Sequence, residues 1–319
     1  MNRNPARYAQ YRDAPYTPPE TGGLERAVLQ TIAYADIFDY PLKLEEIHRY
    51  LDGLRASHDQ IDRLLNRDYL APNFLRVEDG YFTLPDRREI VRTRKIRAQR
   101  SRDLWPKAIN YGRLISWLPF VRMVAVTGAL AMDNEKSNDI DYLIVTEPRR
   151  LWLCRGMVIL LVRWAGLHGD LLCPNYFLSE NALLFKRSDL YTAHELTQMV
   201  PLSGMSIYWK IRAINRWIED FLPNATGLPR TDISVHREIN PHFMRGLAEK
   251  ALRSKLGGWI EDWEMKRKIR KFSLLLPVGS EAEFSVDWCK GHFGGYGQRT
   301  MQTYYERAQV INEFIKFGI

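Results

Sequence analysis

The chain has few cysteines, and the three that it has, Cys154, Cys173 and Cys289, lie far apart in the sequence. An odd number of distant thiols does not form a disulfide framework and is typical of a reducing compartment. No group of cysteine and histidine residues has the spacing of a zinc site. These absences argue against a disulfide-stabilised secreted scaffold and against a zinc-finger module.

Long hydrophobic runs are absent as well. The most apolar helical stretch, residues 151–167, is interrupted by Arg155, Gly156 and Arg163, and it is too short for a convincing transmembrane span. The first thirty residues are polar and rich in proline, and they lack the apolar region of a secretory signal. We therefore expect a cytoplasmic protein without a membrane partner.

Apolar and basic side chains are plentiful. The 319 residues are 45% hydrophobic and 12% aromatic, which is enough for a folded core, and the length predicts two or three domains. The 46 lysines and arginines outnumber the 38 acidic residues, so the formal net charge is +8. This excess favours polyanionic partners such as nucleotides or nucleic acid.

The most informative pattern lies in residues 121–146. Two short runs rich in β-branched residues predict buried strands; Gly128 follows the first run, and Asp139 and Asp141 stand at the head of the second. Because side chains alternate across a strand, the two aspartates point to the same side. Two carboxylates held in this way repel each other unless a cation lies between them, and Mg²⁺ prefers such oxygen ligands.

A strand that ends in glycine, a polar spacer and an Asp-x-Asp pair on the next strand together resemble the DNA polymerase β-type nucleotidyltransferase superfamily. The resemblance covers residues 122–179 and depends on Gly128, Asp139 and Asp141. It implies that the aspartates bind a divalent metal, Mg²⁺ or Mn²⁺, and that the backbone at Gly128 and Ala129 holds the phosphates of a nucleoside triphosphate. Ala129 stands where the family usually has a serine.

The resemblance also implies a third carboxylate on a later strand, which we expect at residues 171–179. Asp170 stands just before that strand and is the first candidate for the base that takes the proton of the acceptor. Asn175 stands in its middle and cannot accept a proton at neutral pH. Ser137 and Asn138, in the turn before the aspartate pair, are candidates for supporting contacts to the nucleotide.

The residues before this core predict an arm over 1–23 and a winged-helix-like domain over 24–86. Three helical stretches, the last one opened by a capping box at Ser57, precede a hairpin that turns at Asp79 and Gly80. Winged helices often bind DNA through the third helix. Here that helix balances its basic residues against acidic ones, so a role in protein contact or packing is the alternative.

A basic segment connects this domain to the core. Residues 87–118 predict a helical linker, and eight basic residues stand against one acidic residue between 87 and 102. Such a run is either a solvated face or a surface that meets a triphosphate or a nucleic-acid backbone. The core is expected over residues 119–189, and a mostly helical C-terminal region over 190–319.

The sequence thus predicts an α+β chain with a small mixed-sheet nucleotidyltransferase core between a winged helix and a helical C-terminal region. The expected function is metal-dependent transfer of a nucleoside monophosphate from a nucleoside triphosphate to a small molecule, a protein or a nucleic acid. Two alternatives remain open. The first is a DNA-binding regulator whose core only senses nucleotides, and the second is an inactive scaffold within a larger complex.

Overall fold

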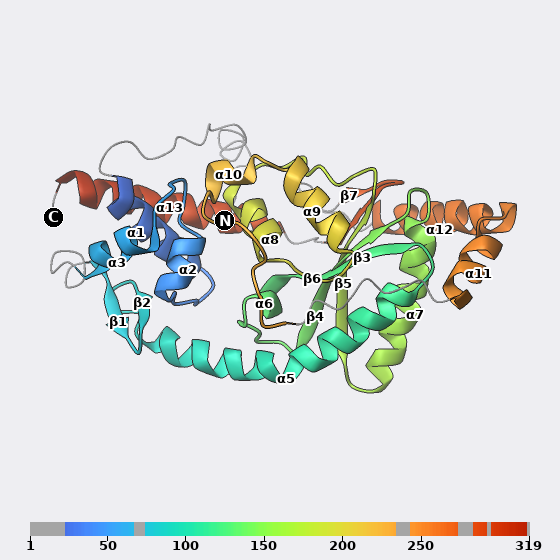
Figure 1. Ribbon diagram of the computed structural model, residues 1–319, viewed down its shortest axis with the longest axis horizontal. Helices are drawn as coiled ribbons and strands as arrows, with labels where there is room; N and C mark the ends of the chain where they lie inside the picture. The colour runs from blue at the N-terminus through green and yellow to red at the C-terminus, as the bar shows by residue number, and fades with distance from the viewer. Residues whose placement is uncertain (1–22, 67–73, 234–242, 274–282, 292–294, 318–319) are drawn as a thin grey trace, which may run out of the picture.

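A mixed six-stranded sheet forms the centre of the molecule, with the strand order β6-β3-β4-β5-β8-β7 (Figure 1). The computed structural model describes residues 23–66, 74–233, 243–273, 283–291 and 295–317, so the predicted arm lies almost entirely outside the described residues. The expectation of an α+β chain with a mixed sheet is confirmed. The strands of the sheet are Val121–Val126 (β3), Asp139–Thr146 (β4), Leu171–Ser179 (β5), Val200–Ser203 (β6), Glu283–Phe284 (β7) and Trp288–Lys290 (β8).

Strand β4 is central to the topology. It pairs antiparallel with β3 and parallel with β5, and the parallel pair is joined by helix α7 (Leu151–Leu167), because parallel neighbours need a crossover connection. The register between β4 and β5 pairs Asp141 with Cys173 and then Leu143 with Tyr176. Strand β5 therefore carries one extra residue at this point, which is a β-bulge.

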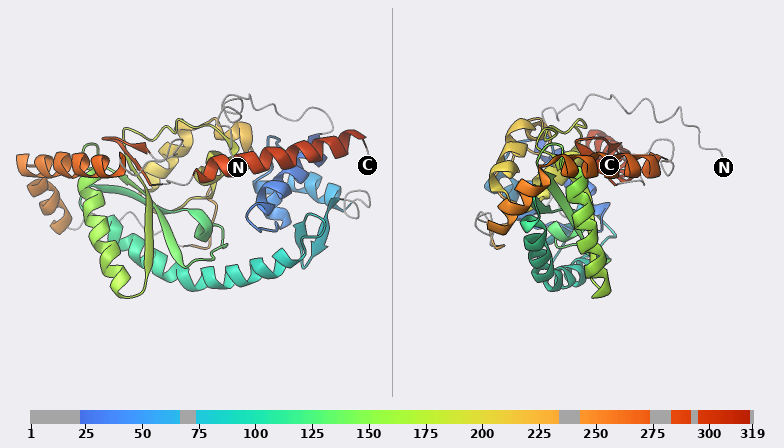
Figure 2. Two further views of the ribbon diagram at one scale, coloured as in Figure 1. Left: turned by 180° about the vertical axis from the view of Figure 1, so that it is seen from behind. Right: turned by 90° about the vertical axis from the view of Figure 1, so that its right-hand side faces the viewer.

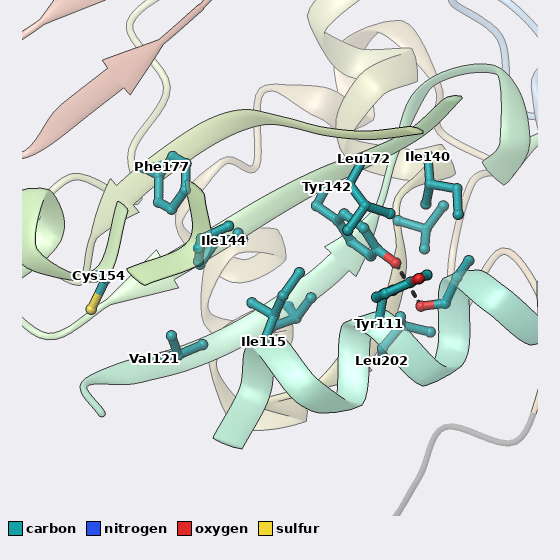
Figure 3. Close-up of a cluster of buried hydrophobic side chains, with 14 of the residues drawn as sticks. Tyr111, Ile115, Val121, Ile140, Tyr142, Ile144, Cys154, Leu172, Phe177 and Leu202 are labelled. Carbon is teal, nitrogen blue, oxygen red and sulfur yellow. Dashed lines mark hydrogen bonds between the residues drawn. The ribbon is translucent and has the colours of Figure 1, made fainter. Parts of the chain in front are cut away.

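Helices cover both faces of the sheet. Ile140, Tyr142 and Ile144 of β4 lie in a core beneath α7 and the long helix α5 (Figure 3). The Tyr142 hydroxyl donates a hydrogen bond to the Ala108 carbonyl at 2.7 Å. The alternate residue Leu143 packs into a second core on the opposite face. The helices that cover the first face include α5 (Glu89–Trp117) and α7, and those that cover the second include α8 (Leu190–Gln198), α9 (Met205–Ile214) and α10 (Ile218–Phe221).

The N-terminal unit has the element order that the sequence predicts. The Ser57 hydroxyl accepts a hydrogen bond from the Gln60 backbone, which confirms the capping box, and the hairpin turns at Asp79 and Gly80, both with positive φ. The C-terminal helix packs along the first helix in both views (Figures 1 and 2), and Arg307 reaches Asp36 at 2.6 Å. The elements are α1 (Gly23–Asp36), α2 (Leu44–Arg49), α3 (His58–Leu65), β1 (Arg76–Glu78), β2 (Tyr81–Thr83) and α13 (Tyr296–Phe317).

The basic segment forms helix α5, a single bowed helix with Pro106 in its interior (Figure 1). Several of its arginines turn inward rather than toward solvent or phosphate. Arg94 is nearly buried; it donates to Glu46 at 2.8 Å and to the Met132 carbonyl at 3.1 Å. Arg97 donates to the Phe38 carbonyl at 3.0 Å. Neither sequence-based interpretation of the run holds for these side chains, which connect α5 to the N-terminal unit.

The C-terminal region is helical only in part. It contributes β6, β7 and β8 to the sheet, so the predicted boundary after residue 189 falls within this layer. Helices α11 (Phe243–Leu252) and α12 (Lys255–Ser273) extend beyond the sheet at the end of the molecule away from α1 (Figure 1). Within the described ranges, no helix is both long and apolar enough to cross a bilayer.

Candidate functional site

Two aspartates and a cysteine come together where β4 begins. Alternation along β4 places Asp139 and Asp141 on the face of the sheet that carries Leu143 and α8, and Cys173 joins them because it is the register partner of Asp141. One ligand atom from each lies within 4.8 Å of the other two, and all three residues are half-buried. The predicted aspartates therefore converge. Cys173 was missed, because only the strand register identifies it.

Gly128 lies directly against one of these carboxylates. Its φ is +66°, and a Cβ at this position would meet Asp141 Oδ2 at 2.2 Å. The preceding Thr127 donates its backbone N–H to the Asp141 carbonyl at 3.0 Å. A side chain here would thus face both backbone strain and a collision. Ala129 follows in the short helix α6 (Gly128–Ala131), where its carbonyl accepts the Asn134 N–H at 2.9 Å and closes the turn.

The turn before β4 holds Asp139 in place. Glu135 is buried and accepts hydrogen bonds from the backbone N–H groups of Lys136, at 2.8 Å, and Ser137, at 2.7 Å. The Ser137 hydroxyl donates to Asp139 Oδ1. Asn138 is exposed and has a φ of +63°, a conformation that asparagine tolerates better than most residues. Ser137 therefore orients an aspartate, and Asn138 supplies the backbone conformation of the turn.

Strand β5 also directs Asn175 toward the aspartates. Asn175 lies two residues beyond Cys173, so side-chain alternation places it on the same side, and the bulge brings Tyr176 to that side as well. The Asn175 Nδ2 donates a hydrogen bond to Asp141 Oδ1. The place where the family resemblance implies a third carboxylate therefore holds an amide.

The structure does not bring Asp170 to this site, which corrects its prediction as the base. Leu171 is the register partner of Asp139, so the residue before it faces the opposite side of the sheet. There the Asp170 carboxylate accepts hydrogen bonds from Lys107 Nζ and the Tyr111 hydroxyl, both at 2.6 Å. These two bonds from α5 hold the pKa of Asp170 below its usual range.

Negative charge is poorly compensated at the site. Burial, followed by the charges of Asp139, Glu195 and Glu135, raises the pKa of Asp141 to about 8. Burial and the two aspartates likewise raise the pKa of the Cys173 thiol to about 12. A divalent cation would relieve this repulsion. The two carboxylates fit Mg²⁺ or Mn²⁺, whereas a protonated thiol fits a supporting position beside them rather than a hard cation.

A pocket of about 220 Å³ opens on the same face of the sheet. Its floor includes Thr127, adjacent to Gly128, and Leu143, two residues beyond Asp141, so it adjoins the aspartates. Polar and aromatic side chains form much of its wall. These residues could not be predicted from the sequence, because they come from separate segments of the chain. They are Tyr176, Lys186, Arg187, Tyr191, Glu195, Glu283, Lys290 and Gln298.

Some of these side chains contact one another. Lys186 forms an ion pair with Glu283, and Lys290 Nζ lies 5.4 Å from the centre of the Tyr176 ring. The pocket thus offers cationic groups and flat aromatic surfaces on the face of the sheet that carries the two aspartates. Comparisons of the chain with protein-family models, with curated proteins and with solved structures give no match.

Proposed function

We propose that this chain is a metal-dependent nucleotidyltransferase that moves a nucleoside monophosphate from a nucleoside triphosphate to an acceptor. The observation that carries the proposal is the convergence of Asp139 and Asp141 beneath Gly128, beside a pocket with cationic and aromatic walls. The order of strand, glycine turn and Asp-x-Asp strand agrees with the polymerase β-type resemblance, and so does the mixed sheet.

Each residue has a distinct role in this proposal. Asp139 and Asp141 would hold Mg²⁺ or Mn²⁺, which neutralises developing charge on the phosphates and lowers the pKa of the acceptor group. Gly128 lets the backbone approach a phosphate without a side chain in between. Ser137 orients Asp139, and Asn175 orients Asp141, through the hydrogen bonds that they donate.

Asn175 favours a second candidate function, nucleotide sensing without efficient turnover. Strand β5 has no acidic residue, so it offers no carboxylate to remove the proton of the acceptor, a step that a general base accelerates by roughly 10²- to 10⁴-fold. In this alternative the N-terminal unit, which we propose to be a winged helix, passes the nucleotide-bound state to a protein or nucleic-acid partner. The exposed side of its helix α3 carries His58, Asp59 and Arg63, a charge balance that favours protein contact over duplex DNA.

The test compares metal-dependent nucleotide binding in three proteins. The parent, Asp139→Asn and Asp170→Asn are heated with each of the four common nucleoside triphosphates, with Mg²⁺ and with EDTA. We expect a Mg²⁺-dependent rise in Tm for the parent and for Asp170→Asn, and none for Asp139→Asn. If Asp139→Asn shows the same rise as the parent, the metal assignment is wrong.

Turnover separates the two candidate functions once binding is established. The nucleotide that binds is supplied with its α-phosphate labelled, and pyrophosphate release and label transfer are measured for the parent. Release that requires both Mg²⁺ and Asp139 supports the transferase. Binding without release supports nucleotide sensing, because the site then holds a metal–nucleotide complex without activating an acceptor.

A further inference from the structure

Helix α12 has two apolar faces, although only one of them is covered. Its inner face packs against the first core through Ile260, Met265 and Ile269. On the same side, Glu261 accepts hydrogen bonds from the backbone N–H groups of Trp152, at 3.0 Å, and Leu153, at 2.6 Å, at the start of α7. A helix anchored in this way normally presents polar residues on its outer side.

The outer face of α12 is apolar along its first half instead. Leu256 is 65% exposed, Trp259 63% and Trp263 50%, and these residues follow one another at helical spacing. The two indole rings lie nearly parallel, with their centres 6.3 Å apart. Leu247, on the neighbouring helix α11, is 53% exposed. Clustered exposure of large apolar side chains marks an interaction surface rather than ordinary surface variation.

The second half of the same face is basic. Lys266, Arg267 and Arg270 are exposed, and the Arg267 guanidinium lies 5.1 Å from the centre of the Trp263 ring. Glu261 is buried on the inner side, whereas Glu264 forms an ion pair with Arg267 at 2.6 Å. Lys266, Arg270 and Lys271, all exposed, still outnumber the one exposed acid of this helix, Asp262. Helices α11 and α12 project from one end of the molecule (Figures 1 and 2), so an extended flat surface can approach them.

We propose that this outer face binds the surface of a bilayer that contains anionic phospholipids. Tryptophan prefers the headgroup level, and leucine reaches the acyl region beneath it. Lysine and arginine then contact the lipid phosphates. Leu247 and Leu256 favour lipid over single-stranded nucleic acid, because an aliphatic side chain has no flat face on which a base can stack. Such adsorption requires no membrane-spanning helix and is independent of the function proposed above.

The experiment is flotation of the full chain with two kinds of vesicle. One is pure phosphatidylcholine, and the other contains about 30% phosphatidylglycerol, a fraction that gives a strongly negative surface potential. We expect the chain to float with the anionic vesicles only, and less so as the salt concentration rises. Trp259→Ser with Trp263→Ser is expected to lower vesicle partitioning at least tenfold, whereas Trp209→Ser, a half-exposed tryptophan on α9, leaves it unchanged.

The variant Lys266→Gln with Arg270→Gln keeps the apolar residues and the ion pair between Arg267 and Glu264, so it tests the proposal even if the tryptophan variant loses its fold. We expect its partitioning into anionic vesicles to fall about tenfold, because each basic group near such a surface contributes severalfold. Equal loss in Trp209→Ser, or no flotation of the parent with anionic vesicles, would overturn the proposal. Retention of the parent on single-stranded oligonucleotides without flotation would also overturn it, and would assign the face to nucleic acid.

Discussion

In metal-free protein, Asp141→Asn should raise stability even though it removes a proposed metal ligand. The folded chain holds the Asp141 carboxyl next to Asp139 and partly buried, and within the described residues its side-chain hydrogen bond comes from the neutral amide of Asn175. Asparagine has nearly the same shape, and its amide oxygen can still accept the hydrogen bond from Asn175. The substitution therefore removes an unfavourable ionisation and keeps the local contact.

The magnitude follows from the pKa of Asp141, which rises from 3.8 to about 8 on folding. A carboxyl with a raised folded pKa reduces stability as pH increases between these two values, because the unfolded chain releases its proton first. Each pH unit above 3.8 costs about 1.4 kcal/mol, which amounts to about 4 kcal/mol at pH 7. The new amide N–H₂ needs a partner, so we expect Asp141→Asn to gain about 2–4 kcal/mol at pH 7 and about 1 kcal/mol at pH 5.

The assay is urea denaturation in EDTA at pH 5, 6, 7 and 8, with Asp170→Asn as the matched control. That control makes the same chemical change one strand away, but Asp170 is an ion-pair partner of Lys107 and has a lowered pKa. It should therefore lose about 1 kcal/mol, with the opposite sign. Addition of Mg²⁺ should stabilise the parent and leave Asp141→Asn unchanged.

The signs of the two changes in the free energy of unfolding test whether Asp141 carries an uncompensated charge. If Asp141→Asn loses stability in EDTA as Asp170→Asn does, the carboxyl is a structural group, and the description of a site with excess negative charge is wrong. A gain that does not grow between pH 5 and pH 8 would refute the raised pKa in particular. A gain together with unchanged Mg²⁺ stabilisation would show that the cation binds elsewhere.

Three further substitutions test other parts of the structure. Gly128→Ala should cost at least about 2 kcal/mol in urea denaturation, and should abolish the Mg²⁺-dependent rise in Tm, because its Cβ meets Asp141 and its φ is positive. Asn175→Asp should tighten Mg²⁺ binding measured by calorimetry and, for the transferase, raise pyrophosphate release; unchanged binding would show that residue 175 does not face the cation. Arg94→Gln should lower the free energy of unfolding by about 2–4 kcal/mol, because it leaves Glu46 without its cationic partner. The salt dependence of polyanion binding should stay the same, and a changed salt slope would show that Arg94 contacts the polyanion.

The sequence was sufficient wherever a local rule decides the structure. The alternation of side chains placed Asp139 and Asp141 on one side of a strand, and the structure brings them together. The capping box at Ser57 and the turn at Asp79 and Gly80 depend on residues close in sequence, and both are confirmed. These predictions needed neither the register of the sheet nor the packing of helices.

Predictions that depend on register or on distant contacts did not follow from the sequence. Asp170 faces the side of the sheet opposite to the aspartates, because the following residue, Leu171, pairs with Asp139 and shares its side. The bulge in β5, which brings Tyr176 to the same side as Asn175, likewise depends on strand pairing that no periodicity reveals. Arg94 belonged to a run that resembled a free basic surface, and its partner Glu46 lies on α2, 48 residues earlier in the chain.

Glu249, a half-buried acid, offers a comparison that supports the ligand-binding role proposed for the aspartate pair. Burial opposes ionisation of Glu249, but hydrogen bonds from Arg122, the Phe120 backbone and Arg245 overcome it and lower its pKa to about 2. Glu249 is thus kept ionised by two cationic side chains and a backbone N–H group. Among the residues that the structure describes, no cationic side chain pairs with Asp141, and a positive-φ Gly128 and a strand bulge lie beside it. Three locally unfavourable features converge on one carboxylate, which is expected where the missing counter-charge arrives with a ligand.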